Sequence, residues 1–362
     1  MSIRFIERFD GNTETSKKRM SRQQITLAKR GVLIKIFSMN SRQRFRETMA
    51  YGSPDRVPFF EEGIRADVIE TWQQQGMPQN VSLASIVPID ERLELAPELL
   101  PETWPDSHAN LDRFRGALDA ADPARLPAGF PDLAARRQRD GDTLLLRVHQ
   151  GLYQTLGVDG WQRFAEVNLL LKDEPDLVHE MLAIQAGFAA DLIERILTQV
   201  RVDGAIFSEP ICGDRGPLIS PQMFDELINT SYEPLLDVLR RFGVELFILR
   251  TYANARSLLP VVLKRGFNCL WASEVTLEAM DYREIRGEYG RDLRLIGGID
   301  VDVLRQDQEA IRRELQEKVP ALLQDGGYIP LADGRVRAVV PYENYIFYRK
   351  LLAEVVGDDT YA

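Results

Sequence analysis

Charged and hydroxyl-bearing side chains stand directly after apolar runs of strand length in the second half of the chain. A mostly apolar run at residues 244–249 is followed by Arg250, Tyr252 and Asn254. Four similar runs end in Glu209, Glu274, Asp300 and Asp333. A β-rich run that ends in polar residues is typical of a barrel strand that delivers side chains into a site. These residue types could bind an anion and transfer protons.

Four of these residues form the predicted catalytic set: Glu209, Arg250, Tyr252 and Glu274. The planar guanidinium of Arg250 could clamp a substrate carboxylate or phosphate, or form a structural ion pair with Glu209 or Glu274. The two glutamates could act as general acid and base, since paired carboxylates shift each other's pKa, or they could pair with Arg250 or Arg215. Tyr252 could donate a proton or a hydrogen bond, or pack as a buried ring.

Other residues near strand ends are predicted to bind the substrate. Glu61 and Arg65 follow a short apolar run that contains two phenylalanines. Asp300 follows a Gly-Gly-Ile turn, where small residues let the backbone approach a ligand, although it could equally cap the next helix. Asn254 and Asp333 complete this set. All are expected at the mouth of one barrel.

The spacing of the apolar runs predicts the elements that position these residues. Successive runs start about 25 to 40 residues apart, which is the length of one strand-plus-helix unit. Amphipathic patterns predict helices at 41–52, 66–76 and 173–200, with Ser41 and Asp173 as N-caps. The sequence therefore predicts an α/β fold, a (β/α)8 TIM barrel.

The barrel is predicted to be a single domain that spans residues 39–362. Seven prolines between 80 and 140 forbid long helices, so this part is expected to be an irregular, proline-rich insertion in the N-terminal third. Residues 1–38 are rich in lysine and arginine, and we expect them to be a disordered basic extension.

Composition excludes several classes of function. The formal net charge of −10 and the pI near 5.1 argue against a nucleic-acid partner or an anionic membrane surface. The two cysteines show no paired pattern, which favours a reducing compartment. No apolar run approaches the roughly 20 residues that would cross a bilayer. We therefore expect a cytoplasmic enzyme whose partner is a small-molecule substrate.

Several motifs occur in order between residues 41 and 350. They are Arg44-Phe-Arg-Glu-Thr-Met, Pro54-Asp-Arg-Val-Pro58, Gly216-Pro-Leu-Ile-Ser-Pro221, Glu274 with Met280-Asp281, Gly297-Gly-Ile-Asp300, Gly326-Gly-Tyr-Ile329 and Val340-Pro-Tyr-Glu-Asn344. Together they resemble the uroporphyrinogen decarboxylase superfamily, and in particular its branch that includes corrinoid-dependent methyltransferases. The resemblance implies a (β/α)8 barrel with its pocket at the C-terminal strand ends, a homodimer, and a corrinoid protein as a possible partner.

The sequence departs from the zinc-dependent members of that branch. Where they have His-x-Cys-Gly-Asn, this chain has Arg250, Tyr252, Ala253 and Asn254, and its last strand offers Asp333 and no thiol. A zinc site that activates thiols needs sulfur and imidazole ligands, and arginine stays protonated. We therefore expect neither the zinc site of the family nor any cofactor bound by a recognisable motif, so a corrinoid would come through a partner protein.

The haem-pathway decarboxylase has an arginine-rich loop after its first strand, because its substrate carries many carboxylates. This chain has Glu61, Glu62 and Arg65 there, which predicts an acidic rim that repels a polyanion. Methyl transfer or demethylation of a small substrate is therefore the favoured function. Decarboxylation of a porphyrinogen or a smaller acid is the first alternative, and a decayed, non-catalytic binding subunit is the second.

Overall fold

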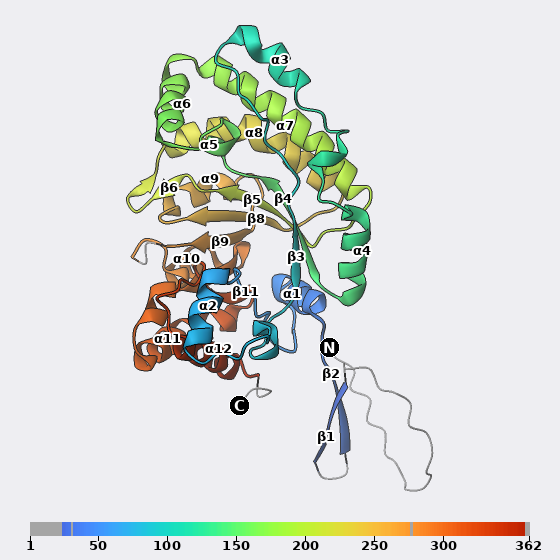
Figure 1. The fold of residues 1–362 in the computed structure, drawn as a ribbon, viewed down its shortest axis with the longest axis vertical. Coiled ribbons are helices and arrows are strands. Elements are labelled where there is room, and N and C mark those ends of the chain that lie inside the picture. Colours follow the sequence, from blue (N-terminus) through green and yellow to red (C-terminus); the bar gives the residue numbers. More distant parts are fainter. Residues whose placement is uncertain (1–23, 30–31, 276–277, 359–362) are drawn as a thin grey trace.

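A curled sheet of seven parallel strands forms the centre of the molecule (Figure 1). The computed structural model describes residues 24–29, 32–275 and 278–358. The strand order is β11-β10-β9-β8-β5-β4-β3. The strands are β3 (Arg92–Leu95), β4 (Thr143–His149), β5 (Gly204–Glu209), β8 (Phe247–Tyr252), β9 (Cys269–Ser273), β10 (Arg294–Ile299) and β11 (Tyr328–Ala332). The α/β prediction is confirmed for this sheet, but among the described residues its edge strands β3 and β11 do not pair to close a barrel.

The gap between the edge strands contains the predicted first strand at Phe59 and Phe60, which the structure shows as extended chain and not as a strand. Its backbone groups bond to side chains. The N–H of Phe59 donates to Asp90 Oδ2 at 2.7 Å, and the carbonyl of Phe60 accepts from Arg349 Nη1 at 3.3 Å. The carbonyl of Phe59 accepts from the backbone N–H of Asp90 at 2.8 Å, just before β3, but the segment does not join the strand ladder.

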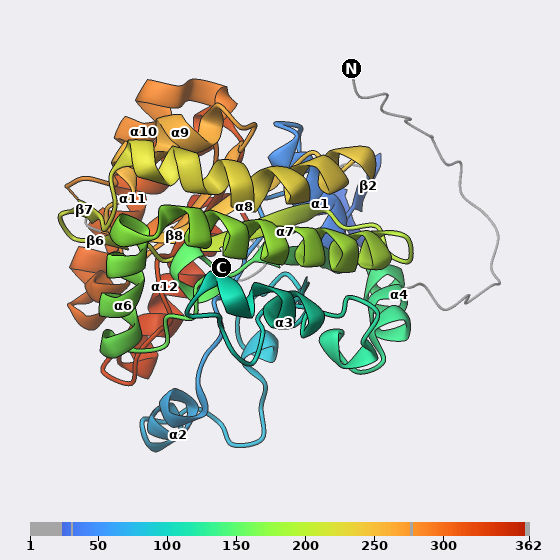
Figure 2. The same cartoon turned by 90° about the horizontal axis from the view of Figure 1, so that it is seen from above.

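Helices cover the outer face of the sheet, and α7 and α8 lie side by side across it in both views (Figures 1 and 2). The helices are α1 (Ser41–Met49), α2 (Ala66–Gln74), α3 (Leu111–Gly116), α4 (Phe130–Asp140), α5 (Leu152–Thr155), α6 (Trp161–Asp173), α7 (Pro175–Leu197), α8 (Pro221–Arg241), α9 (Leu259–Leu263), α10 (Tyr282–Tyr289), α11 (Gln308–Asp325) and α12 (Tyr342–Val355). No helix of the described residues is long and apolar enough to span a bilayer.

Capping residues explain where the predicted helices begin. At α1 the cap is Asn40 and not Ser41, because the Asn40 side chain accepts from the backbone of Gln43, whose own side chain accepts from the Asn40 backbone. At α7 the residue before the helix is Glu174, since Asp173 still belongs to α6. The two N-cap predictions were therefore each wrong by one residue.

Alternation along the strands separates two apolar layers. One set of strand residues packs against the helices, and the other forms an interior cluster inside the curl of the sheet. The interior cluster consists of Phe45, Met49, Phe60, Leu145, Ile206, Leu246, Ile248, Cys269, Trp271, Ile296, Ile329 and Leu331. Its members Phe45 and Met49 come from α1, which therefore covers the amino-terminal end of the sheet. The opposite, C-terminal end is free for a site.

Two parts of the chain differ from the sequence expectation. The proline-rich part at 80–140 contains β3 and two helices, so the stretch expected to be a loop around residue 92 supplies a strand of the central sheet. In the basic extension, residues 1–23 lie outside the described residues. The antiparallel strands β1 (Gln24–Lys29) and β2 (Val32–Phe37) pair with each other and extend away from the sheet (Figure 1).

Candidate active site

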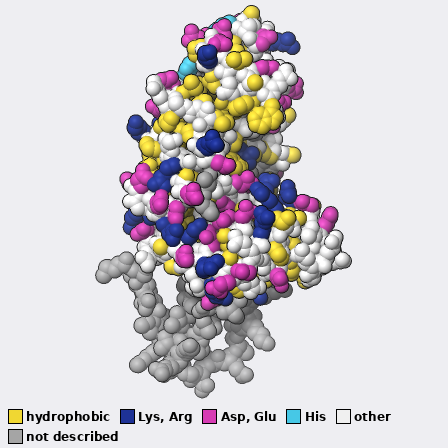
Figure 3. Space-filling view, turned by 90° about the vertical axis from the view of Figure 1, so that its left-hand side faces the viewer, with side chains coloured by type: hydrophobic (Ala, Val, Ile, Leu, Met, Phe, Trp, Pro, Cys, Tyr) yellow, Lys and Arg dark blue, Asp and Glu magenta, His cyan; other side chains and the backbone are white. Residues whose placement is uncertain are grey.

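A cavity of about 750 Å³ opens at the C-terminal ends of the parallel strands. This mouth cavity is lined by five arginines and two glutamates: Arg65, Arg147, Arg250, Arg335, Arg337, Glu62 and Glu274. The whole chain has a net charge of −10, so the excess of arginine here is local. Figure 3 views the molecule from the side on which β6 (Cys212–Gly213) lies, and basic and acidic side chains are interspersed across its middle.

The floor of the mouth cavity is built around Glu94 of β3. Arg250 pairs with it through two hydrogen bonds, Nη1 to Oε1 at 3.1 Å and Nη2 to Oε2 at 2.8 Å. Arg147 Nε donates to Oε1 at 2.8 Å from the neighbouring strand. Burial alone would raise the pKa of Glu94, but the charges and hydrogen bonds of Arg250 and Arg147 lower it to about 2. Glu94 is therefore ionised and holds both arginines in place.

Aromatic rings complete this floor. The guanidinium carbon of Arg250 lies 4.2 Å from the centre of the Trp271 ring, and that of Arg92 lies 5.1 Å from the same ring. Burial lowers the pKa of Arg92, the negative charge of Glu62 opposes this, and the positive charge of Arg250 adds to the lowering. Three guanidinium groups thus converge on two carboxylates, Glu62 and Glu94, which leaves the floor with a net positive charge.

Two buried polar atoms of the floor have no hydrogen-bond partner among the described residues. They are Nε of Arg250, which is a donor, and Oε1 of Glu62, which is an acceptor. A buried polar atom without a partner costs about 1 to 3 kcal/mol. The floor beneath the mouth cavity therefore holds one donor and one acceptor that no described residue satisfies.

The rim of the mouth cavity is more exposed than its floor. Tyr252 is 37% exposed, and Glu274 pairs with Arg337 at 3.0 Å while both side chains are about half exposed. Glu274 would point to the helical layer if strand alternation continued. Its φ of 47° lies in the left-handed region, and this turn brings its carboxylate to the mouth cavity. Arg335 forms no ion pair with a described residue.

Glu209, the first predicted catalytic residue, lies on the other side of the sheet. Its carboxylate is buried and accepts hydrogen bonds from the Tyr232 hydroxyl at 2.5 Å and from the backbone N–H of Leu152 at 3.1 Å. Burial raises the pKa of Glu209 to about 7, although both hydrogen bonds oppose the shift. It does not line the mouth cavity and pairs with neither Arg250 nor Arg215 among the described residues. The predicted pairing of Glu209 with Glu274 is therefore not seen.

His149 lies in the same outer layer as Glu209. Its Nδ1 accepts from the backbone N–H of Gly151 at 2.9 Å, and its Nε2 lies 2.9 Å from the Ser231 hydroxyl. Burial lowers the pKa of His149 to about 3, so the ring is neutral at physiological pH. Both ring nitrogens are already hydrogen-bonded, which leaves neither one for a substrate.

The structure places the other predicted binding residues as follows. Arg65 lines the mouth cavity, whereas Glu61 points into the outer layer and pairs with buried Arg349 at 3.1 Å. Asp300 caps the 3-10 helix Val301–Arg305 by accepting from the N–H of Asp302. Asn254 accepts from the N–H of Arg256. Of the predicted binding residues, only Arg65 lines the mouth cavity.

Asp333 joins the ends of three neighbouring strands. Its carboxylate accepts from the backbone N–H of Val275 at 3.0 Å and of Val301 at 2.9 Å. Burial raises the pKa of Asp333 to about 6, and these two hydrogen bonds oppose the shift. The nearby glycines Gly297 and Gly298 serve packing, because a Cβ on Gly298 would lie 2.6 Å from the Tyr282 ring. This close approach is to a side chain of the protein, and not to a ligand as expected.

The residues do not fit the zinc site of the resembling family. In the described part of the chain, no three His, Cys, Asp or Glu side chains lie together in a way that could hold a metal ion. Cys212 lies in the hairpin formed by β6 and β7 (Gly216–Pro217), and Cys269 lies in the interior cluster at the start of β9. Burial raises the pKa of each thiol to about 12, and the two cysteines lie in separate parts of the fold, so they do not form a pair of metal ligands.

Sequence reasoning missed Glu62, Arg147, Arg335 and Arg337, which line the mouth cavity. It also missed Arg92 and Glu94, which interact with these residues or with Arg250 in the floor. Alternation would have placed Glu62 and Arg147 on the same side as Phe60 and Leu145, which are members of the interior cluster. The expectation of an acidic rim was wrong, because Glu61 turns away and four arginines from later segments join Arg65. Glu94 carried no usable signal, because the short strand β3 lies in a proline-rich stretch.

Comparisons with known proteins support the fold. No family model matches the chain, and no curated protein matches it in sequence. Its fold is similar to that of a methyltransferase from Methanosarcina mazei, with a TM-score of 0.60 and 15% sequence identity over 90% of this chain and 100% of that chain. A putative vitamin-B12 independent methionine synthase from Listeria monocytogenes has a TM-score of 0.37 and 9% identity over 83% of this chain and 98% of that chain. Only the first of these two values indicates a shared fold.

Proposed function

We propose that this protein is an enzyme of the uroporphyrinogen decarboxylase superfamily that transfers a methyl group from a small acidic substrate bound in the mouth cavity. The observation that supports it best is the cluster of five arginines and two glutamates at the C-terminal ends of parallel strands. The arginines attract an anionic substrate, and the glutamates among them restrict how it can be oriented. The superfamily motifs and the fold shared with a methyltransferase supply the reaction type.

The floor of the cavity suggests how the substrate binds. A substrate carboxylate lies against the guanidinium group of Arg250, which lines the cavity and is held by Glu94 through Nη1 and Nη2. A hydroxyl or amino group of the substrate donates to Oε1 of Glu62. Because Glu94 and Trp271 already fix the guanidinium of Arg250, the substrate meets a preorganised anchor. We expect a substrate with both an acid group and a hydrogen-bond donor.

The reaction breaks the bond between the methyl carbon and a heteroatom of the substrate. The electron pair of that bond stays on the heteroatom, and the hydroxyl of Tyr252 donates a hydrogen bond to the charge that develops there. The methyl group passes to a nucleophile supplied by an acceptor, for which the superfamily resemblance suggests a corrinoid carried by a partner protein. Because the residues do not fit zinc, no step of this scheme uses that metal.

Decarboxylation is the second candidate. The excess of arginine in the mouth cavity supports it more strongly than the acidic rim that the sequence predicted. The positive charge that remains after the arginines pair with Glu94 and Glu274 could attract a substrate with several carboxylates, such as a porphyrinogen. The third hypothesis is a decayed binding subunit. It predicts that the charged side chains at the strand ends pair with each other and leave no room for a ligand. The cavity of about 750 Å³ and the unpartnered floor atoms disfavour that hypothesis.

Parallel assays distinguish the two reactions. Purified protein is incubated with free cob(I)alamin and a panel of O-, N- and S-methylated small carboxylic acids, and methylcobalamin is followed by its absorbance. Release of carbon dioxide from uroporphyrinogen is measured on the same preparation. Methylcobalamin that forms with the unchanged protein, and at least about 100-fold more slowly with Arg250→Met, supports methyl transfer. Identical behaviour of both proteins in both assays would remove the mouth cavity as the active site.

A further inference from the structure

A second cavity, of about 1190 Å³, lies at the opposite end of the sheet. This bottom cavity is bounded by two connections, from α7 into β5 at residues 198–203 and from α8 into β8 at residues 242–246. Side chains of α1 and the first residue of β10 close its other sides. The amino-terminal face of such a sheet ordinarily serves stability. A cavity this large on that face is therefore unexplained by the fold or by the proposed reaction.

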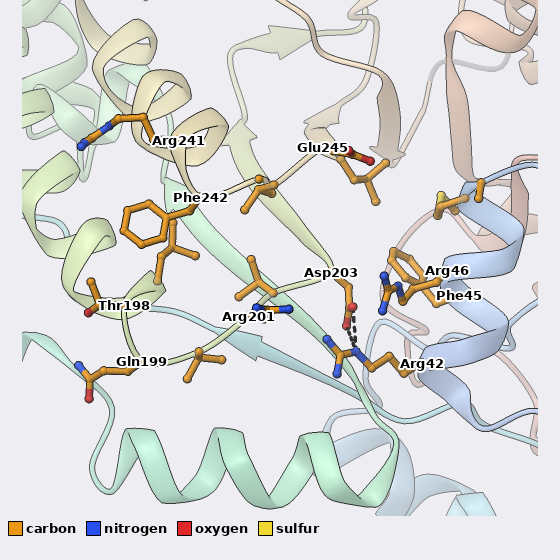
Figure 4. A pocket seen from close by; sticks show the side chains of 18 of the residues that line it. Arg42, Phe45, Arg46, Thr198, Gln199, Arg201, Asp203, Arg241, Phe242 and Glu245 are labelled. Carbon is orange, nitrogen blue, oxygen red and sulfur yellow. Dashed lines mark hydrogen bonds and ion pairs between the residues drawn. The ribbon is translucent and has the colours of Figure 1, made fainter.

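Arginines dominate the charge of the bottom cavity. Five arginines line it, Arg42, Arg46, Arg201, Arg241 and Arg294, against two acids, Asp203 and Glu245. In Figure 4, the side chains of Arg46 and Arg201 extend toward the Arg42–Asp203 ion pair from opposite sides, whereas Arg241 points away from it. Three guanidinium groups thus gather where only one carboxylate lies.

Most of the hydrogen-bond donors in this group are not used by the protein. Arg42 uses only its Nε, at 2.8 Å from Asp203, whose carboxylate also accepts from the backbone N–H of Leu144. Arg46 and Arg201 form no side-chain hydrogen bond or ion pair with any described residue. Asp203 is 1% exposed at its side chain, so it is fully engaged and cannot serve these two arginines as well. The free donors are therefore available to an anion.

The bottom cavity also has negatively charged groups, which attract positively polarised parts of a ligand. We therefore expect a ligand that is not only an anion. The C-terminal ends of α7 and α8 border it, and each helix end carries about half a negative charge. Glu245 adds an exposed carboxylate. The negative charge of these groups suits hydroxyl or amino groups of a ligand. The ring of Phe242, 37% exposed, offers an apolar surface on the same wall.

We propose that the bottom cavity binds an organic phosphate, with its phosphate on Arg42, Arg46 and Arg201. The hydroxyl- or amino-bearing part of the ligand then lies against Phe242 and the C-terminal ends of the two helices. Guanidinium groups bind phosphate through paired, charge-assisted hydrogen bonds. The volume of about 1190 Å³ exceeds the usual range of about 300 to 1,000 Å³ for small-molecule pockets, so a ligand of nucleotide size fits it better than inorganic phosphate does.

Isothermal titration of the full chain tests this site with three probes: adenosine 5′-monophosphate, adenosine and inorganic phosphate. We expect the monophosphate to bind at one site and more tightly than either of the other probes. Arg46→Ala and Arg201→Ala should each weaken that binding by about 10- to 100-fold, the usual value of one hydrogen bond to a charged group. Circular dichroism checks that each variant is folded.

Two matched variants locate the site. Arg113→Ala removes an exposed arginine of α3 that is distant in sequence from both cavities, and Arg335→Ala removes one from the mouth cavity. Neither change should alter the affinity for the monophosphate. Loss of binding in Arg335→Ala alone would move the ligand to the mouth cavity and overturn this proposal. Unchanged affinity in Arg46→Ala and Arg201→Ala, or no binding of the monophosphate at all, would show that these arginines only offset the helix ends.

Discussion

Glu94 and Glu209 lie near the C-terminal ends of strands in the same sheet, yet they occupy opposite chemical environments. Glu94 points into the curl, where Arg250 and Arg147 lower its pKa to about 2. Glu209 points to the helices, where burial raises its pKa to about 7. The side of the sheet that a residue faces, and not only its place at a strand end, decides whether it can reach a substrate.

Adjacent residues show the same difference within one short segment. Glu61 faces the outer layer and pairs with Arg349, whose side chain is 1% exposed. Glu62 faces the mouth cavity, and its buried Oε1 has no hydrogen-bond partner among the described residues. Glu61 therefore acts on stability, and Glu62 is available for a ligand.

The largest expected effect comes from Glu61→Ala. The substitution leaves the guanidinium of Arg349 buried without a carboxylate, which should lower the free energy of unfolding by about 3 kcal/mol or more. Urea denaturation followed by circular dichroism measures this loss. Glu62→Ala is the matched comparison and should cost less than Glu61→Ala, because Glu62 forms no ion pair with a described residue and its removal only weakens the charge compensation of Arg92. Equal losses in the two variants would contradict the division between the two faces.

Acid titration should reveal Glu94 through the pH dependence of stability. Its pKa is lower in the folded than in the unfolded protein, so its contribution is present above about pH 4.5 and is lost as the pH falls toward 2. A shift of this size corresponds to about 3 kcal/mol. The measured quantity is the difference in unfolding free energy between the unchanged protein and Glu94→Gln, which should shrink over this range. A constant difference would mean that the arginines do not stabilise the carboxylate.

Glu209 should show the opposite sign. Its pKa is higher in the folded protein, so its contribution is fully present below about pH 4.5 and is lost as the pH rises through 7. Glutamine resembles the protonated side chain and does not titrate. We therefore expect Glu209→Gln to match the unchanged protein near pH 5 and to exceed its unfolding free energy at pH 8 by up to about 3 kcal/mol. If the two proteins differed equally at both pH values, Glu209 would titrate normally.

The sequence was sufficient for most of the strands and for about half of the charged residues of the mouth cavity. Apolar runs located six of the seven strands, including residues 144–149 of β4. Arg250 and Tyr252 line the mouth cavity because both share the side of Ile248. The same two-residue alternation of side chains along a strand would have assigned Glu209 to the side of Phe207, which packs against the helices. Ignoring this alternation, and not a lack of signal, put Glu209 in the predicted catalytic set.

Other parts of the site depend on long-range packing that no local pattern shows. Glu94 comes from a four-residue strand among prolines, and its partner Arg250 is 156 residues further along the chain. Glu274 reaches the mouth cavity only because its backbone adopts a positive φ. Such a turn is rare for a residue with a side chain, so alternation would have assigned Glu274 to the wrong face.

Arg337→Ala should have the smallest effect on the free energy of unfolding. It tests whether the exposure of a side chain matters for stability as much as the side of the sheet that it faces. Arg337 and Glu274 face the mouth cavity as Arg250 does, but their side chains are 49% and 55% exposed. An exposed ion pair contributes less than about 1 kcal/mol and is screened by salt. Urea denaturation should therefore show a small loss at low ionic strength that disappears in concentrated salt. A loss as large as that of Glu61→Ala, or one that salt leaves unchanged, would mean that the rim is as rigid as the buried floor around Glu94.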